Sequence, residues 1–429
     1  MDLIQWVVVL NISLTVLLGA AYFYQLVYLL IGLVGKARKR PGRGEDAPLH
    51  RYAAVVAARN EAGVIGELLR TLREQDYPRE LLDLYVIADN CTDGTAEVAR
   101  RAGAIVYQRY DQTRRGKGYA LDTFFHWLAE AGRDTYDGYL IFDADNLVDP
   151  NFVREMDRVF ATGKYDAITS YRNSRNYGTN WISAGYALWF LREARFLSAP
   201  LMALGSNCHV SGTGFLVSAQ TIRANGGWPF HLLTEDIQFS VDCALQWRRI
   251  GYCEKAVVYD EQPVTFRQSL DQRLRWSKWF YQVDLRYGAS LLRGIFRGGR
   301  QGWSCYDMLM TVAPWMLLTL AVLLFNVVIC GACLFEPAYI ARWVVALALE
   351  SIQSAVVGFY LGLFLYGAVT TLTEWKQIHT GAGKKLLYLF TFPIFMFTYV
   401  PISLAALVRK VEWKPIYHTG GKKVAKELQ

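Results

Sequence analysis

The chain contains long runs without charged side chains, and these limit its possible folds more than any other feature. Four runs carry at most one charge: residues 3–35, 308–335, 343–373 (with Glu350) and 386–408. A helix needs about 20 apolar residues to cross a hydrocarbon core of roughly 30 Å, and each run has that length. Buried core helices rarely contain so long an uncharged run. We therefore predict an N-terminal transmembrane helix at 1–35 and C-terminal transmembrane helices within 306–409.

The charges that flank the first run indicate its orientation. Basic residues follow it: Lys36, Arg38, Lys39, Arg40 and Arg43. A cleaved signal peptide has its positive charge ahead of a shorter apolar core of about 7–15 residues, so we interpret the first run as an anchor. Because basic flanks stay in the cytoplasm, we expect a multi-pass plasma (inner) membrane protein with its N-terminus outside. The formal charge of +8 then reflects contacts with the lipid bilayer, and no nucleic-acid partner is expected.

The last apolar run is interrupted by Pro393 and Pro401, so it forms either a kinked span or a re-entrant hairpin. Three crossings after a cytoplasmic domain would place Arg409 and the basic tail at 410–429 outside, against the same charge rule. We therefore expect one of the three late segments to be re-entrant or interfacial, and 386–408 is the first candidate.

Residues 44–305 have charges and turns in normal proportion, and strand patterns alternate with helix patterns. The predicted strands are 52–58, 84–88, 105–108 and 138–142, and the predicted helices are 61–74, 95–102 and 120–131. This alternation indicates parallel βαβ units, in which ligands bind beyond the carboxyl ends of the strands. The sequence has no GxGxxG after the first strand, no Walker A motif and no GxSxG elbow, which disfavours dinucleotide-binding, P-loop and serine-hydrolase enzymes.

Carboxylates follow the second and fourth predicted strands directly. Asp143 and Asp145 suit Mg²⁺ or Mn²⁺, which proteins commonly bind with one or two carboxylates plus substrate phosphates; a plain turn is the alternative. Asp89 and Asn90 offer acceptors where the base or ribose of a nucleotide would bind. Arg59, Asn60 and Glu61 follow the first strand in the same way. Lys117, in a glycine-flanked loop, either reaches a phosphate or belongs to a solvated basic loop.

Two motifs beyond the first four strands also suit this chemistry. In Thr234-Glu235-Asp236, a carboxylate either acts as general base for an attacking hydroxyl or follows Thr234 as the cap of the next helix, and both roles are compatible. Helical spacing puts Gln272, Arg275 and Trp276 on one face. Arginine and glutamine suit a pyrophosphate and a tryptophan ring stacks on a sugar, whereas an ordinary amphipathic helix is the alternative.

Six motifs stand in order after a transmembrane helix: RNE (59–61), ADN (88–90), DAD (143–145), SGTG (211–214), TED (234–236) and QRLRW (272–276). The series resembles that of the membrane-integrated family 2 glycosyltransferases, which include the cellulose, chitin, hyaluronan and poly-N-acetylglucosamine synthases. The resemblance covers about residues 50–280 by motif. It implies an α/β, GT-A-like domain in the cytosol at 44–280, with a mostly parallel sheet and helices on both faces, beside an α-helical transmembrane region.

The resemblance also implies roles for these residues. Asp89 would bind the uracil or ribose, and Asp143 and Asp145 the donor phosphates and the metal, with Asp145 the direct ligand. Asp236 would be the catalytic base, supported by Glu235. Other donor-binding residues would be Arg59, Asn60, Glu61, Asn90, Lys117, Gln272 and Arg275. The acceptor would be bound by Trp276 and by the loop of Ser211, Gly212, Thr213 and Gly214.

The function implied is an inverting, metal-dependent hexosyl- or N-acetylhexosaminyltransferase. It would use UDP-GlcNAc or UDP-glucose to extend a polysaccharide processively and pass it across the membrane. One alternative is transfer of a single sugar to a lipid carrier or membrane glycolipid. Another is a catalytically inactive transporter or sugar-binding protein, which has no need of all five residues Asp89, Asp143, Asp145, Asp236 and Trp276.

Residues 180–204 and 277–294 interleave aromatic, aliphatic and Arg side chains, so they form either interfacial amphipathic helices or ordinary core helices. We expect an interfacial segment at 281–305. Cys330 and Cys333 have no second cysteine pair near them, so no zinc site is expected.

Overall fold

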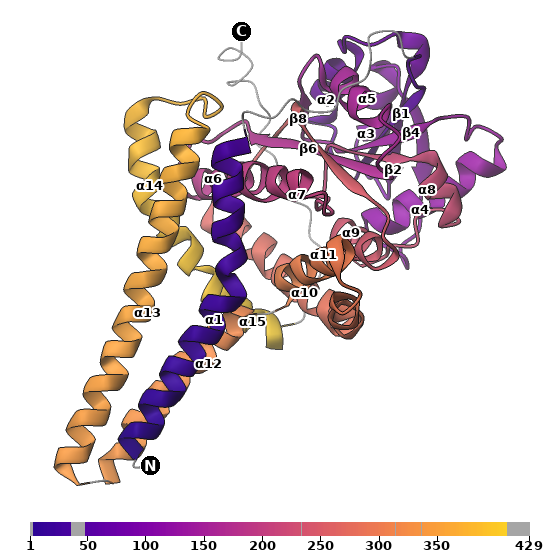
Figure 1. Ribbon diagram of the computed structural model, residues 1–429. Helices are drawn as coiled ribbons and strands as arrows, with labels where there is room; N and C mark the ends of the chain where they lie inside the picture. The colour runs from indigo at the N-terminus through magenta and orange to yellow at the C-terminus, as the bar shows by residue number, and fades with distance from the viewer. Residues whose placement is uncertain (1–2, 36–47, 233, 314, 336, 410–429) are drawn as a thin grey trace.

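The computed structural model describes residues 3–35, 48–232, 234–313, 315–335 and 337–409 (Figure 1). The basic flank at 36–43 and the tail at 410–429, on which the predicted orientation depends, lie outside the described residues. The central feature is an eight-stranded sheet in the order β3-β2-β1-β4-β7-β6-β8-β5. Its strands are β1 (Tyr52–Ala58), β2 (Leu82–Asp89), β3 (Ile105–Arg109), β4 (Gly138–Asp143), β5 (Leu147–Val148), β6 (Ala167–Ser174), β7 (Phe215–Ser218) and β8 (Ile250–Asp260).

The first four strands pair in parallel, as the alternation of strand and helix patterns predicts. Beyond β4 the sheet becomes mixed, because β7 runs antiparallel to both β4 and β6, while β6 and β8 are parallel. In the parallel half, Ala58 pairs with Ala88 and Ala57 with Asp143. This register brings the carboxyl ends of β1, β2 and β4 to one edge of the sheet.

Helices cover both faces of the sheet, because alternate strand residues are apolar on both sides. On one face, Ala53 and Val55 of β1 belong to a core with α4 (Lys117–Glu130). On the other, Ala54 and Val56 pack with α2 (Ile65–Arg73), α3 (Thr95–Arg101) and α5 (Phe152–Phe160). The helices α8 (Ala219–Ala224) and α9 (Glu235–Gln246) follow β7. The expected α/β fold with two helical layers is confirmed.

The segment 180–204 is a core element. It forms α6 (Trp181–Glu193), a π-helical turn (Ala194–Ser198) and α7 (Ala199–Leu204), and most of its side chains are buried. Asn180 begins α6 with a capping box. The first helix crosses the π turn so closely that a Cβ on Gly32 would lie 2.5 Å from the Phe196 ring. Of the two expectations for this segment, the core helix is therefore the correct one.

The segment 277–294 is more exposed. It lies in α10 (Phe266–Ile295), which turns back into α11 (Gly299–Val312). Val283 and Leu291 are buried against α9 and α11, whereas Leu285 and Phe296 are 87% and 84% exposed. The C-terminal half of α10 therefore has two apolar faces: one packs against α9 and α11, and the other is exposed.

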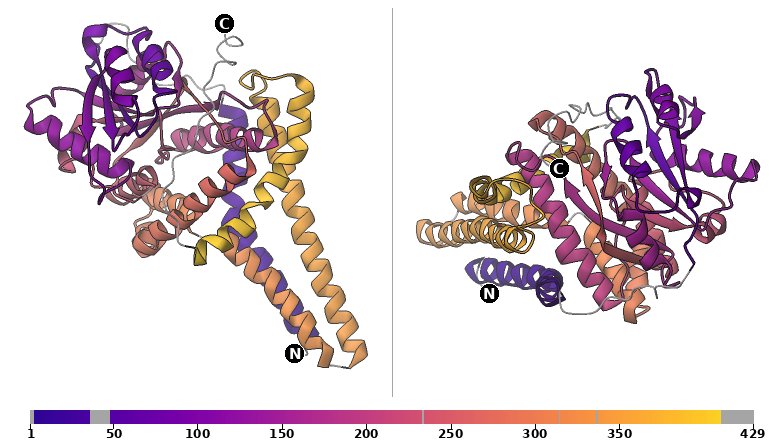
Figure 2. Two further views of the ribbon diagram at one scale, coloured as in Figure 1. Left: turned by 180° about the vertical axis from the view of Figure 1, so that it is seen from behind. Right: turned by 90° about the horizontal axis from the view of Figure 1, so that it is seen from above.

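Among the described residues, three helical stretches are long and apolar enough to cross a membrane: Gln5–Val34 within α1 (Leu3–Val34), α13 (Ala338–Thr373) and Ala382–Val408. Helices α1, α12 (Trp315–Ala332) and α13 extend away from the sheet together, with the N-terminal end of α1 farthest from it (Figures 1 and 2). Apolar side chains such as Ile12, Val16 and Phe23 are exposed along α1. Such a surface fits a lipid environment.

Two apolar runs differ from a single straight helix. The run 308–335 is divided, because α11 ends at Val312 and α12 begins at Trp315. Met308 and Val312 pack in the core beside α9, so the run is not one continuous helix. A membrane crossing by α12 stays a prediction. The last run is interrupted as its prolines suggest: α14 (Ala382–Phe397) ends before Thr398, and α15 (Tyr399–Val408) then packs along α10 (Figure 2).

Candidate active site

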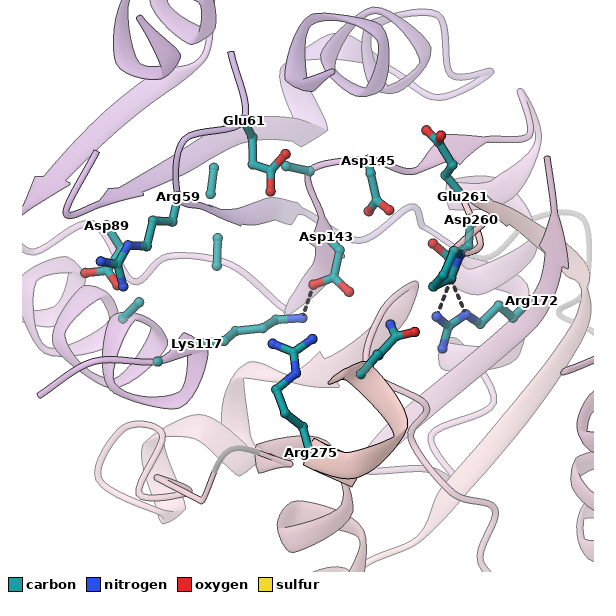
Figure 3. Close-up of a pocket in the computed structure, with 17 residues that line it drawn as sticks. Arg59, Glu61, Asp89, Lys117, Asp143, Asp145, Arg172, Asp260, Glu261 and Arg275 are labelled. Atoms are coloured by element: carbon teal, nitrogen blue, oxygen red, sulfur yellow. Dashed lines mark hydrogen bonds and ion pairs between the residues drawn. The ribbon is translucent and has the colours of Figure 1, made fainter. Parts of the chain in front are cut away.

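A cavity of about 260 Å³ opens at the carboxyl ends of β1, β2 and β4. Eight of the residues predicted to bind the donor or metal line it: Arg59, Glu61, Asp89, Lys117, Asp143, Asp145, Gln272 and Arg275 (Figure 3). They come from five separate parts of the chain. The residues predicted from the strand ends and those predicted from the α10 motif therefore line the same cavity.

The Asp143–Asp145 segment begins where β4 ends. Asp143 is part-exposed and its backbone N–H donates to Thr213 Oγ1 at 2.9 Å. Asp145 is buried, and burial together with the nearby carboxylates of Asp260 and Asp143 raises its pKa well above the usual range. The turn interpretation also holds, since Asn146 N–H donates to the Asp143 carbonyl at 3.3 Å.

These carboxylates fit a divalent cation. Burial and the charges of Asp143 and Asp93 likewise raise the pKa of Glu61 to about 8, so the cavity wall concentrates acidic groups that repel one another. A cation would relieve that repulsion. Within the described ranges, no three His, Cys, Asp or Glu side chains are grouped so that they could hold a metal by themselves. A partial site completed by substrate phosphates is the pattern usual for Mg²⁺.

Lys117 connects the acidic motifs at the start of α4. Its Nζ atom donates to Asp143 Oδ1 and to the Gly212 carbonyl, both at 2.6 Å, and lies 3.8 Å from Glu235 Oε1. Burial alone would lower the pKa of Lys117, but Asp143 and Glu235 raise it. The next residue must be glycine: a Cβ on Gly118 would lie 2.0 Å from the Phe230 carbonyl oxygen.

Asp89 lines the cavity from the end of β2, where Arg109 donates to its Oδ1 at 2.6 Å. Burial raises the pKa of Asp89, although Arg109 opposes that shift. Asn60 and Asn90 lie outside the cavity lining, both with positive φ. Asn60 accepts from Thr92 N–H at 2.8 Å, and Asn90 accepts from Asp111 N–H at 2.9 Å. Both amides therefore join neighbouring loops, and their predicted contact with a donor stays a prediction.

Glu235 and Asp236 form the first turn of α9. Thr234 occupies the N-cap position, but its hydroxyl makes no capping hydrogen bond, so the predicted side-chain cap is wrong. Burial raises the pKa of Glu235 to about 8, although Lys117 opposes the shift, and raises that of Asp236 to about 6. Neither residue lines the cavity itself. A carboxylate that titrates near neutral pH is suited to act as a general base.

The loop of residues 211–214 lies between the DAD and TED segments. The Ser211 carbonyl accepts from Arg172 at 2.9 Å, and Thr213 hydrogen-bonds Asn146. A Cβ on Gly212 would lie only 3.6 Å from Asp236 Oδ2. The four loop residues are not among those lining the cavity, and their predicted contact with an acceptor stays a prediction.

Gln272 and Arg275 reach the cavity from α10, whose N-terminus is capped by the Thr265 side chain. Burial lowers the pKa of Arg275. Trp276 does not line the cavity; its ring packs edge-on against Tyr186 at 5.7 Å and Phe190 at 6.4 Å. Arg275 and Trp276 are consecutive, so their side chains diverge by about 100° around the helix.

Comparison with known proteins gives the family. A family model described as Glycosyltransferase like family 2 matches residues 50–278, which is more than half of the chain. The chain belongs to this family. All the cavity-lining residues lie within the matched range.

This family 2 member has relatives that include proteins named for different products. It is 27% identical over 252 residues to a beta-monoglucosyldiacylglycerol synthase of Synechocystis sp., covering 57% of this chain and 51% of the relative. It is 25% identical over 282 residues to a poly-beta-1,6-N-acetyl-D-glucosamine synthase of Staphylococcus aureus, covering 63% of each. The chain thus spans about half to three fifths of the length of these relatives.

A solved structure shares the fold. The mannosyltransferase PcManGT from Pyrobaculum calidifontis, in complex with GDP-Man and Mn²⁺, superposes with a TM-score of 0.55 at 18% identity. The match covers 95% of this chain and 99% of that chain, so it includes apolar helices as well as the sheet. The GT-A-like fold inferred from the motif series is confirmed.

Four polar residues near the cavity were not anticipated from the sequence. Three of them line the cavity directly: Arg172, Asp260 and Glu261. The fourth, Arg109, donates a hydrogen bond to the carboxylate of Asp89. Arg172 Nε donates to Asp260 Oδ2 at 2.9 Å, and its guanidinium lies 3.8 Å from the Phe190 ring (Figure 3). Asp260 ends β8 as Asp143 ends β4, so the strand-end rule would have found it had β8 been recognised as a member of the sheet.

Proposed function

We propose that the protein is an inverting glycosyltransferase that takes a sugar from a nucleotide-diphospho-sugar and adds it to a hydroxyl of a membrane-bound acceptor. The observation that carries the proposal is the convergence of Asp89, Asp143, Asp145 and Arg275 on one cavity, with Asp236 beyond it. Burial raises the pKa of Glu235 to about 8 and that of Asp236 to about 6, and Lys117 lies between the two acidic motifs.

The reaction follows from these positions. Asp236 removes the proton from the acceptor hydroxyl, whose oxygen attacks the anomeric carbon as the bond to the diphosphate breaks on the opposite face. Lys117 and Arg275 are placed to offset the negative charge that grows on the leaving diphosphate. Asp89 holds the nucleoside, with Arg109 fixing its carboxylate. Asp143 and Asp145 would hold Mg²⁺ or Mn²⁺, which when bound supplies further charge neutralisation at the diphosphate.

For the acceptor, we favour transfer of a single sugar to a lipid. The Trp276 ring packs in an apolar cluster with Tyr186, Phe190 and Phe395 of α14, so this packing covers the ring that a growing polymer would stack on. The named activity of the glucosyldiacylglycerol synthase relatives agrees with this choice. Processive extension, with passage of the polymer across the membrane, is the second candidate and is favoured by the poly-N-acetylglucosamine synthase relatives.

Membrane seating is part of the proposal. We place the N-terminus outside and the sheet in the cytoplasm, with the exposed stripe of α10 at the interface. That stripe consists of Leu285, Ala289, Leu292 and Phe296, spaced four, three and four residues apart, and exposed arginines flank it at positions 286, 293 and 297. Apolar residues at helical spacing beside arginines are typical of helices that lie on an anionic bilayer surface.

A donor and product assay tests these points. Purified protein in nanodiscs is given UDP-glucose, UDP-GlcNAc or GDP-mannose with Mg²⁺ or Mn²⁺, and nucleoside diphosphate release is measured with and without diacylglycerol. We expect release from one of these donors and a lipid product carrying one sugar. A ladder of products would establish processive extension in its place, and binding without release would support the sugar-binding alternative.

A further inference from the structure

A second buried polar cluster lies away from the donor cavity, and the proposed reaction does not use it. His209 precedes the loop 211–214, and its Nε2 atom lies 2.6 Å from Asp307 Oδ2 on α11. Both side chains are almost fully buried, at 3% and 1% exposure. Removing one member of so close a buried pair leaves the other polar group buried without it, which is costly.

The same aspartate is bound by the first helix. Tyr28 of α1 is fully buried, and its hydroxyl donates to Asp307 Oδ1 at 2.9 Å. Trp303 Nε1 donates to that hydroxyl, also at 2.9 Å, and Tyr306 donates to the Ala21 carbonyl at 2.6 Å. These contacts hold α11 against α1. The residues of α1 that take part lie within Gln5–Val34, which is apolar and long enough to cross a membrane.

On its other side, the cluster leads to the proposed base. Val210 N–H donates to Ser240 Oγ at 2.9 Å, and Ser240 Oγ in turn donates to the Asp236 carbonyl at 2.9 Å. Two residues further on, the Gly212 carbonyl accepts from Lys117. The position of His209 therefore sets where the segment 209–212 meets Asp236 and Lys117.

We propose that His209 and Asp307 are positioning residues that couple the seating of α1 to the acceptor side of the active site. Helix α11 is packed between α1, through Tyr28, and α9, through Val241 and Ala244. A shift of α1 in the membrane moves Asp307, and with it the loop that borders Asp236. Displacements of about 1 Å in catalytic geometry can cost on the order of 10²-fold in rate. The rate consequence rests on the proposed function; the mechanical coupling does not.

The test compares Tyr28→Phe with Tyr24→Phe. Both remove one hydroxyl from the same face of α1 and keep the ring, and Tyr24 lies in the same aromatic cluster, 5.2 Å from Tyr28. Amide hydrogen exchange is measured in nanodiscs over residues 207–214 and over the control strand β1. We expect Tyr28→Phe to speed exchange at 207–214 by about tenfold or more, with β1 and Tyr24→Phe unchanged.

Kinetics on the same proteins separate this inference from the proposed function. Tyr28→Phe and His209→Gln should lower kcat about tenfold or more, while the KM for the donor stays close to wild type. Adding Asp307→Asn to His209→Gln should restore part of the lost kcat, because the double variant no longer buries a carboxylate that has lost its histidine partner. Unchanged exchange at 207–214 in Tyr28→Phe would overturn the coupling. If exchange at 207–214 is faster in Tyr28→Phe but the wild type transfers no sugar, the coupling is supported and the proposed function is rejected.

Discussion

At the scale of single residues, Asp236 gives the most direct pH signature. Its pKa is raised to about 6 by burial, so the carboxylate is protonated below that pH and cannot accept a proton from the acceptor. We therefore expect kcat to rise with pH through about 6 and then level off, as measured by nucleotide release across the range from about pH 5 to 8. Asp242→Asn, on the same helix, should keep the profile; a flat profile in the wild type would contradict the role of Asp236.

Asp145 should govern metal binding. Replacing it with asparagine removes one carboxylate ligand, and we expect the affinity for Mn²⁺ in the presence of UDP to fall by about 10–100-fold or more. Electron paramagnetic resonance of Mn²⁺ measures this without turnover. Asp134→Asn, a surface substitution beside Arg223, is the control. Equal Mn²⁺ affinity in wild type and Asp145→Asn would exclude this carboxylate as a ligand.

The sequence revealed individual site residues where a simple geometric rule applies. Asp89, Asp143 and Asp145 follow strands that pair in parallel, and parallel strands align their carboxyl ends. Arg172 and Asp260 could not be found this way, because β6 and β8 join the sheet through β7, a pairing between distant segments that local pattern does not show. Trp276 lies on the same side of the helix as Gln272. Its side chain is rotated by about 100° around the helix axis from that of Arg275, and it does not line the cavity.

At the scale of elements, the start of α4 is fixed by a close backbone approach. Because a Cβ on Gly118 would lie 2.0 Å from the Phe230 carbonyl oxygen, Gly118→Ala should push the segment before α9 away from Lys117. We expect a loss of about 1–3 kcal/mol in the free energy of unfolding and a lower kcat. Gly63→Ala, where the added Cβ meets nothing within 4 Å, should leave both unchanged. Denaturation in detergent micelles measures the difference, and equal stability of the two variants would refute the close contact.

The helices also show what an uncharged run can and cannot predict. Absence of charge is equally compatible with lipid and with a protein core. The run 3–35 forms one helix with exposed apolar side chains, whereas 308–335 is split between a core helix and a shorter apolar one. The buried segment 180–204 has the same mixture of residues as 277–294, and only its packing against β6, α13 and α14 distinguishes the two.

At the scale of the whole molecule, the exposed stripe of α10 should contact lipid. A photoactivatable diazirine in the acyl chains of a nanodisc should label peptides containing Leu285, Leu292 and Phe296. Tyr110, an equally exposed aromatic residue of the sheet domain at 70% exposure, should escape labelling. Labelling of the Tyr110 peptide with none at α10 would require a different seating of the protein on the bilayer.

The central claim is that one cavity binds an activated sugar and that Asp236 begins its transfer to the acceptor. The most direct measurement is nucleoside diphosphate release by wild type and Asp236→Asn in nanodiscs, alongside the binding of UDP to each. The account predicts metal-dependent release by the wild type, a rate lower by about 10²–10⁴-fold in Asp236→Asn, and equal nucleotide binding by both. Equal release by the two proteins would contradict it.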